Sequence, residues 1–338
     1  MFDRRHFLKI AGVAPLVLLA PQAAVASGAR RRVLVLVELK GGNDGLNTVV
    51  PFADPAYRRL RPQLAIPGDQ LLKLSDTIGL HPALDGVRAS FDAGDVAIVQ
   101  GVGYDHPNRS HFRSIEIWET ASASDDYLED GWLARALRAR DATASDLVAE
   151  GVSIGGEDVG PLRGDGVRAL TVHDPKRFFQ ATKRVMRQTD VRSKNPALAH
   201  VLQTQRELIT ASSSLEDRLS ALPAKAPAFP MSRVGRQLEV AARLLLGDVP
   251  LMVVKVTHGS FDTHANQLGA HQNLLAQLDE ALTAFRDAMR GAGLWEDVLV
   301  MTYSEFGRRA AQNGSRGTDH GAAAPQFFMG GRVKGGLY

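Results

Sequence analysis

Residues 34–51 read LVLVELKGGNDGLNTVVP, and this stretch decides the fold class. An apolar run typical of a fully buried strand, Leu34 to Leu39, is followed at once by Lys40, two glycines, Asn43 and Asp44. Turn chemistry alone explains such a change, because Gly, Asn and Asp tolerate positive φ and favour turns. A second interpretation places Asp44 at the carboxyl end of a central strand, where open α/β sheets bind their ligands.

Strand-like runs alternate with helical patterns along the rest of the chain. The runs are 33–39, 96–100, 251–256 and 298–303, and the helical patterns are 82–91, 195–222, 233–246 and 271–289. Alternation of this kind predicts an α/β fold: a doubly wound, mostly parallel sheet with helices on both faces. We expect a single domain from residue 27 onward.

The first 26 residues, MFDRRHFLKIAGVAPLVLLAPQAAVA, have the pattern of an export signal. The Arg4-Arg5 pair precedes an apolar stretch, and small residues end the segment, so we expect a twin-arginine-type signal peptide that is cleaved after Ala26. The apolar stretch is short and contains prolines, and we therefore expect no stable membrane span after cleavage. The alternative is an uncleaved anchor. The expected partner during export is the twin-arginine translocase, and the expected location is periplasmic or extracellular.

Composition excludes several classes of chemistry. The chain has no cysteine, which excludes disulfides, thiolate metal ligands and a cysteine nucleophile. Without Asp3, Arg4, Arg5 and Lys9 the formal net charge of +3 falls to +1, and no basic stripe predicts binding to nucleic acid.

Polar side chains follow the apolar runs at the points where the expected strands end. The segments are QGVGYDHPNRSHF (100–112), VTHGSFDTH (256–264), YSEFGRR (303–309) and, after a glycine-rich loop, GTDHG (317–321). Because parallel strands share their carboxyl edge, we expect convergence of Asp44, Ser110, His111, Asp262, His264, Glu305 and His320. Imidazoles and carboxylates without thiolates suit zinc, manganese or magnesium, and a metal pair suits phosphoryl transfer.

Simpler interpretations of these residues stay open at this stage. Asp44 is as well explained by a turn as by a ligand role. Asp262 has the position of an N-cap for the helix that follows it, a role compatible with ligation. Ser110 is a second candidate cap. Metal chemistry is favoured because four strand exits all carry His, Asp or Glu.

The motifs together resemble a family. GGNDGLNTVVPFADPAYRRLRP (41–62), GLHPAL (79–84), NRSHF (108–112), SFDTHANQ (260–267), SEFGRR (304–309) and GTDHG (317–321) are similar to the DUF1501 family of exported bacterial proteins. That family is in turn similar to the alkaline phosphatase and sulfatase superfamily.

The resemblance implies an alkaline-phosphatase-like core with one or two divalent metals at the carboxyl edge of the sheet. It implies that Asp44 is a metal ligand from the first strand, that Asp262, His264 and His320 hold one metal, and that Glu305 replaces an aspartate ligand. Zinc, manganese, magnesium and calcium are equally compatible with these residues.

The chain also departs from the superfamily pattern. Phe306 stands where a metal histidine is usual, which leaves the second metal open. Asp262 and His264 are two residues apart rather than four, so His258 and His111 are alternative ligands. The sulfatase signature is absent. The sequence stops at Tyr338, where the family usually continues, and the expectation is a 27–338 domain that lacks its C-terminal end.

Two functions are consistent with these residues. The first is an exported, metal-dependent hydrolase of phosphate or sulfate esters, acting on a small-molecule or polymer substrate. Its expected catalytic residues are Ser110, Arg109 and His111, with Ser110 or a hydroxide ion as nucleophile, and its expected substrate-binding residues are Asn43, Asn108 and Arg308. The alternative is a non-catalytic periplasmic assembly or binding protein that keeps the fold, with or without one structural metal.

Overall fold

The computed structural model describes residues 31–139, 147–156, 158–172, 193–220 and 228–338. The expected export signal, residues 1–26, lies outside the described residues. No helix in the described part of the chain is long and apolar enough to span a bilayer.

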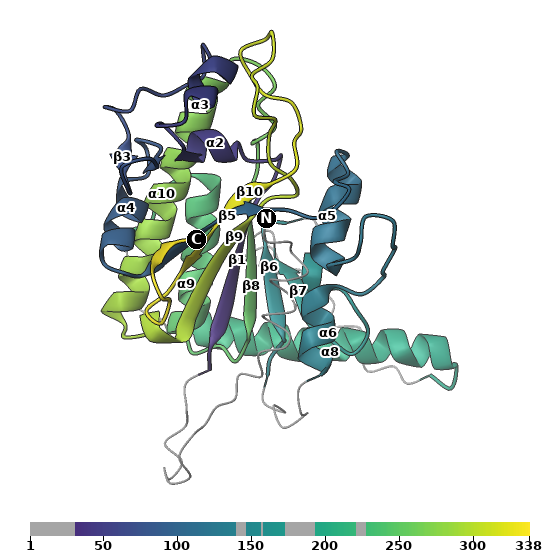
Figure 1. Ribbon diagram of the computed structural model, residues 1–338. Coiled ribbons are helices and arrows are strands. Elements are labelled where there is room, and N and C mark those ends of the chain that lie inside the picture. The colour runs from purple at the N-terminus through teal and green to yellow at the C-terminus, as the bar shows by residue number, and fades with distance from the viewer. Residues whose placement is uncertain (1–30, 140–146, 157, 173–192, 221–227) are drawn as a thin grey trace, which may run out of the picture.

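A central sheet of eight strands organises the domain (Figure 1). From one edge to the other the strands are β11 (Gly336–Leu337), β5 (Val96–Val102), β10 (Ala324–Met329), β9 (Val298–Tyr303), β1 (Val33–Leu39), β8 (Val253–His258), β6 (Gly151–Ile154) and β7 (Ala169–Val172). β1 lies in the middle, between β8 and β9, and is parallel to both. The bounds of β1 are those that the sequence predicts for the buried first strand.

One strand, β10, runs against the others. It pairs antiparallel with both β9 and β5, whereas β6 pairs parallel with β7 and β8. Its register shifts at Pro325, which has no N–H to donate to a ladder and is tolerated at such an irregularity. The sheet is mostly parallel, so the prediction of a doubly wound α/β fold is confirmed.

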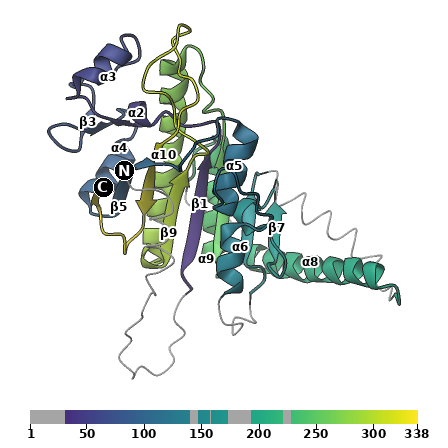
Figure 2. The ribbon, with the colours of Figure 1, turned by 45° about the vertical axis from the view of Figure 1, so that its right-hand side comes forward.

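Helices cover both faces of this sheet. One face carries α4 (Asp85–Asp92), α9 (Arg233–Leu246) and α10 (Gln267–Gly291), and the other carries α5 (His111–Thr120) and α6 (Trp132–Arg138), as Figures 1 and 2 show. Alternate residues of β1 serve the two layers: Val35 and Val37 belong to the core under α9 and α10, whereas Leu36 packs with Trp118 of α5. Burial on both faces explains why β1 is a continuous apolar run.

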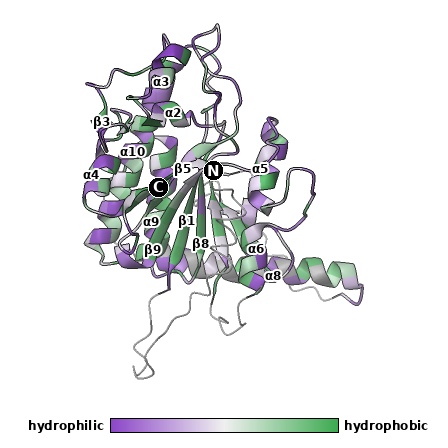
Figure 3. Ribbon diagram, viewed as in Figure 1, coloured by the Kyte–Doolittle hydropathy of each residue, from purple (hydrophilic) through white to green (hydrophobic). Residues whose placement is uncertain are grey.

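Helix α9 begins where its sequence predicts. The Ser232 hydroxyl accepts a hydrogen bond from the Gly235 N–H at 3.2 Å, which caps the helix. Figure 3 shows mainly hydrophobic strands in the centre of the domain, and helices that alternate between hydrophobic and hydrophilic along their length. The long helix α8 (Pro196–Ser220) projects away from this body (Figure 2).

A small second layer lies beyond the carboxyl edge of the sheet. It consists of α2 (Gly45–Thr48), α3 (Pro55–Leu60) and a three-stranded sheet of β2 (Val49–Val50), β4 (Gly79–Leu80) and β3 (Leu72–Lys73). The loop from Ser304 to Ala323 rises next to α2 and α3 (Figure 1). The carboxyl edge is therefore enclosed by loops that follow β1, β5, β8 and β9.

Candidate metal centre

Three ligand atoms from two loops meet at the carboxyl edge. The Nε2 atoms of His264 and His320 lie 2.9 Å apart, and each lies 3.0 Å from Oδ1 of Asp262. Asp262 and His264 follow β8, and His320 follows β9 through the long loop. Gly317 permits this approach, because a Cβ at that position would lie 2.2 Å from the carbonyl of His264.

The hydrogen-bond partner of Nδ1 in His320 determines whether Nε2, the nitrogen that faces Asp262, carries a proton or a lone pair. Nδ1 of His320 lies 2.8 Å from the backbone carbonyl of Arg109, which only accepts hydrogen bonds, so Nδ1 carries a proton. In the neutral imidazole, Nε2 then presents its lone pair toward the Asp262 carboxylate. Nδ1 of His264 similarly faces Oδ1 of Asp319 at 3.4 Å. An acceptor thus orients each imidazole through its outer nitrogen, as hydrogen-bond acceptors orient histidines that bind metals.

His111 approaches the same carboxylate from α5. Its Nε2 lies 3.3 Å from Oδ2 of Asp262, and its Nδ1 lies 2.7 Å from Oε1 of Glu305. The hydrogen bond to Glu305 raises the pKa of His111, and the charges of Glu305 and Asp262 raise it further against a smaller opposing effect of burial. Ligand atoms of His111, Asp262 and His320 all lie within 4.8 Å of one another.

The carboxylate at the centre is held in its ionised form. Partial burial raises the pKa of Asp262, but the hydrogen bond and charge of Arg308, together with the neighbouring imidazoles of His320 and His264, outweigh this effect and lower the pKa to about 2. The guanidinium of Arg308 is completely buried; it donates to Oδ1 of Asp262 at 2.6 Å and to the carbonyls of Gly42, Thr318 and Phe261. Arg308 therefore fixes the position of Asp262.

The donor set fits one divalent cation. Two or three imidazole nitrogens and one carboxylate, oriented by outer acceptors, match the ligands that zinc and similar ions take in proteins. The arrangement of His320 supports the same conclusion, because a lone pair aimed at a carboxylate is unfavourable unless a cation or a proton lies between them. The residues Asp262, His264 and His320, expected from the sequence as one ligand set, lie together with His111. His258 lies elsewhere, since its Nε2 hydrogen-bonds to the carbonyl of Leu274.

Glu305 contacts the centre through His111. One of its oxygens, Oε1, also accepts from the Gly41 N–H at 2.8 Å, which ties the exit of β9 to the exit of β1. Gly41 has φ of +118°, and a Cβ there would lie 2.5 Å from the Asp262 nitrogen. A glycine at the end of β1 is therefore required for the close approach of these two loops. This geometry makes Glu305 an orienting partner of His111.

Asp44 is engaged elsewhere. Its two carboxylate oxygens accept from Nη1 and Nη2 of Arg61 at 2.6 and 2.9 Å, and Gln267 donates to one of them. Burial raises the pKa of Asp44, but the charge and hydrogen bonds of Arg61 outweigh burial, and the pKa is lowered. The role of Asp44 as a metal ligand stays a prediction, and its contacts in this structure are those of a buried ion pair.

Two of the expected substrate-binding residues point into the protein. Asn43 is buried and bonds to Thr48 and to His271 through its side chain. The guanidinium of Arg308 donates its hydrogen bonds to Asp262 and to backbone carbonyls. In Asn108, Oδ1 accepts from the backbone N–H of Ser110 at 2.8 Å.

Ser110 and Arg109 are exposed beside the centre. Ser110 occupies the N-cap position of α5, directly before His111, but its side chain makes no capping hydrogen bond. A cavity of about 430 Å³ adjoins this region and is bordered by Arg109, Arg308 and Arg309. Sequence reasoning missed Arg309 and Asp319, although both directly adjoin residues that it selected.

Phe306 fills the space beside the cluster. Its ring packs against the rings of His320 and His111, at centroid separations of 4.4 and 4.9 Å. Phe306 is buried, and it gives the cluster an apolar wall. The described residues accordingly provide one cluster of three or more potential ligands.

Comparisons with known proteins give a family and distant similarities of fold. The family model described as "Protein of unknown function (DUF1501)" matches residues 30–338. No protein with a curated description matches the sequence.

Among solved structures, the chain is similar to a protein in the alkaline phosphatase superfamily from Vibrio parahaemolyticus, at 13% identity and a TM-score of 0.42, covering 91% of this chain and 62% of that one. It is also similar to the soluble domain of lipooligosaccharide phosphoethanolamine transferase A from Neisseria meningitidis (10% identity, TM-score 0.40, 91% of this chain and 79% of that one). A third is the C-terminal periplasmic domain of EcEptC from Escherichia coli in complex with Zn (8%, 0.40, 92% and 76%). The chain thus spans less than two thirds of the first of these proteins.

Proposed function

From the premise that this chain belongs to the DUF1501 family, we propose that it is an exported, metal-dependent hydrolase of phosphate or sulfate esters. The observation that carries the proposal is the convergence of the His264 and His320 Nε2 atoms on one oxygen of Asp262. Both rings are oriented from outside by acceptors, as the ligands of a divalent cation are.

The ion would be held by Asp262, His320 and His264 or His111. When bound, it would supply Lewis-acid stabilisation of the charge that develops on the ester oxygens. Glu305 would orient the His111 ring, and Arg308 would keep Asp262 ionised and in place.

The nucleophile in this proposal is the Ser110 hydroxyl. It is exposed at the N-terminus of the ten-residue helix α5, where backbone N–H groups and the helix dipole favour an anionic group. Its attack on phosphorus or sulfur would release the alcohol and leave a seryl ester for water to cleave. The exposed guanidinium groups of Arg109 and Arg309 border the adjoining cavity and suit the anionic oxygens of the substrate.

The alternative is a non-catalytic periplasmic assembly or binding protein, with or without one structural metal. The observation that favours it is the saturation of Asp44 by Arg61 and Gln267. A carboxylate held in this way is not available to a second ion, and many phosphoryl-transfer sites use two.

Metal content and turnover measured on the same preparations test the proposal. Elemental analysis of the purified chain should give about one divalent ion per molecule, and Asp262→Asn and His320→Gln should lose it. Asp105→Asn, which removes a charge from an exposed residue of the same region, is the matched control and should keep the ion.

Turnover is then measured with 4-nitrophenyl phosphate, bis(4-nitrophenyl) phosphate and 4-nitrophenyl sulfate. Metal-dependent cleavage of one of these esters, lost in Asp262→Asn and kept in Asp105→Asn, supports the hydrolase. The absence of cleavage of any ester, with or without a bound ion, supports the non-catalytic alternative, and a protein without bound metal contradicts the hydrolase.

A further inference from the structure

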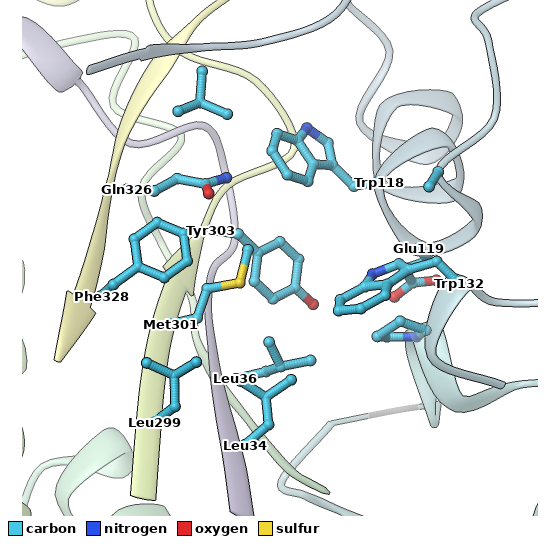
Figure 4. A pocket seen from close by; sticks show the side chains of 13 residues that line it. Leu34, Leu36, Trp118, Glu119, Trp132, Leu299, Met301, Tyr303, Gln326 and Phe328 are labelled. Atoms are coloured by element: carbon cyan, nitrogen blue, oxygen red, sulfur yellow. The ribbon is translucent and has the colours of Figure 1, made fainter. Parts of the chain in front are cut away.

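A cavity of about 180 Å³ lies against the face of the sheet that carries α5, apart from the candidate metal centre (Figure 4). None of the metal-centre residues lines it. Its walls are formed by strands β1, β9 and β10 on one side and by α5 and α6 on the other. The lining residues that matter here are Leu36, Trp118, Trp132, Met301, Tyr303 and Phe328.

Size and lining indicate the kind of molecule that fits. An engineered apolar cavity of about 150 Å³ stays dry and binds benzene, so a cavity of this volume accommodates a six-membered ring with a small substituent. The indole rings of Trp118 and Trp132 and the phenyl ring of Phe328 offer faces and edges for packing against a second aromatic ring. Water would find few hydrogen-bond partners among these side chains.

Tyr303 supplies a polar atom in this apolar setting. The residue is 5% exposed, and its hydroxyl has no hydrogen-bond partner among the described residues. Figure 4 shows the hydroxyl pointing toward Trp132 and Glu119. Burial, together with the charges of Glu38 and Glu119, raises the pKa of Tyr303 well above its usual value. The hydroxyl therefore stays protonated and can donate a hydrogen bond.

The neighbouring charged groups are already paired. The ammonium of Lys255 lies 3.2 Å from Oε1 of Glu119, 3.3 Å from Glu38 and 3.2 Å from Asp158. This cluster occupies the donors of Lys255. Among the fully buried side-chain polar atoms of the described residues that line the cavity, the Tyr303 hydroxyl is the one without a hydrogen-bond partner. An occupant that satisfies it must carry an acceptor atom.

We propose that this cavity binds an uncharged aromatic molecule that carries one acceptor oxygen, and that Tyr303 donates a hydrogen bond to that oxygen. The aromatic ring packs between Trp118, Trp132 and Phe328. The proposal rests on cavity shape and an unpartnered hydroxyl, and it is independent of the proposed ester hydrolysis.

A matched pair of probes tests it. Acetophenone and ethylbenzene have nearly the same shape, and only acetophenone carries an acceptor oxygen. Binding to the purified chain is measured by calorimetry and by quenching of tryptophan fluorescence. Acetophenone should bind at least ~10-fold more tightly than ethylbenzene, because one hydrogen bond to a buried donor is satisfied only by the ketone.

Three variants sharpen the experiment. Tyr303→Phe should remove the preference for acetophenone and leave ethylbenzene binding unchanged. Leu299→Trp, a change at the exposed rim, should weaken both probes by at least ~10-fold because it narrows the entrance. Asp262→Asn should bind both probes as the wild type does, which separates this cavity from the metal centre.

Four outcomes would overturn the inference: the absence of saturable binding of either probe, equal affinity for the two, an unchanged preference in Tyr303→Phe, or tighter binding of benzylammonium than of acetophenone. The last result would indicate that the aromatic rings and carboxylates select a cation.

Discussion

Asp44 and Arg61 form a bidentate ion pair that is almost completely buried, with side chains 1% and 0% exposed. Arg61 also donates to the carbonyls of Arg309 and Ala310 and to the side chain of Asn47. The pair therefore joins the end of the central strand to α3 and to the loop that carries His320. A core strand ends in a carboxylate here because a guanidinium 17 residues away is buried against it.

Removal of Arg61 should destabilise the fold strongly. Arg61→Met leaves the Asp44 carboxylate buried without its partner, and breaking one side of a buried pair costs about 3–5 kcal/mol. Urea unfolding at neutral pH measures the change. Arg59→Met, at an exposed position of α3, the helix that ends directly before Arg61, is the control and should change stability by less than ~0.5 kcal/mol. Similar losses in both variants would contradict this view of the pair.

The same contacts predict the behaviour of Asp44→Asn. Because Arg61 and Gln267 already engage both oxygens of Asp44, the variant should lose stability yet keep its bound metal. Elemental analysis compares the metal content of Asp44→Asn with that of Asp262→Asn. Loss of metal from Asp44→Asn would restore the ligand role that the sequence suggests.

His271 should make the protein sensitive to mild acid. Burial lowers the pKa of His271 to about 4, against a smaller raising effect of Asp44, and Nε2 lies 2.9 Å from Oδ1 of Asn43. The unfolded chain titrates near pH 6.5, so between pH 6.5 and 4 it binds more protons than the folded chain. The stability that neutral His271 contributes is present above pH 6.5 and is lost as pH falls toward 4, by roughly 3 kcal/mol.

Urea unfolding at pH 7.5, 6.5, 5.5 and 4.5 measures this loss. His271→Gln keeps a donor for Asn43 but cannot titrate, and its stability should vary less over the same range. The lowered pKa of Asp44 acts below pH 4, whereas burial also lowers the pKa of His81 to about 4, so that His81 titrates in this window in both proteins. Parallel pH profiles for the two proteins would rule out His271 as the cause.

Three of the four strands predicted from sequence, β9, β1 and β8, lie side by side in the middle of the sheet, and the fourth, β5, lies next to its β11 edge. β1 and β9 have their predicted bounds because both are largely apolar runs, β1 through burial on both faces and β9 through burial of alternate residues on one face. β6 and β7 have four residues each, too few for a clear pattern. β10 contains Pro325 and runs antiparallel after a long loop, so neither its composition nor its direction was evident.

The sequence predicted those features of the candidate site that follow from the strand topology, namely which residues lie at the same edge of the sheet. Residues at the exits of parallel strands must share one edge, and this brings Asp262 close to His111 and His320. The hydrogen-bond and ion-pair partners of individual side chains could not be predicted in this way. The segment RRLRP offers Arg58, Arg59 and Arg61, and only the folded chain shows that the third is the partner of Asp44. Arg308, likewise, reads as a substrate ligand until its carbonyl partners are seen.

Substitution of the arginine pair at the start of the chain tests the predicted route of export. Replacement of Arg4 and Arg5 by Lys should leave the precursor in the cytoplasm, because twin-arginine signals depend on the paired guanidinium groups. Fractionation followed by immunoblotting measures the distribution. A Lys-Lys variant that is exported normally would remove the twin-arginine assignment.

Substitution of two serines, each at the start of a helix, distinguishes a catalytic role from a capping role. Ser110 makes no side-chain capping bond at α5, whereas the Ser232 hydroxyl caps α9. Ser110→Ala should therefore keep its melting temperature and its metal, and lose at least ~100-fold in turnover of whichever ester the wild type cleaves, since the nucleophile is gone while binding remains. Ser232→Ala should lose about 1 kcal/mol of stability and keep its turnover per folded molecule. Melting temperature, metal content and turnover are measured on the same preparations. A Ser110→Ala protein that remains fully active would exclude Ser110 as nucleophile and leave attack to water.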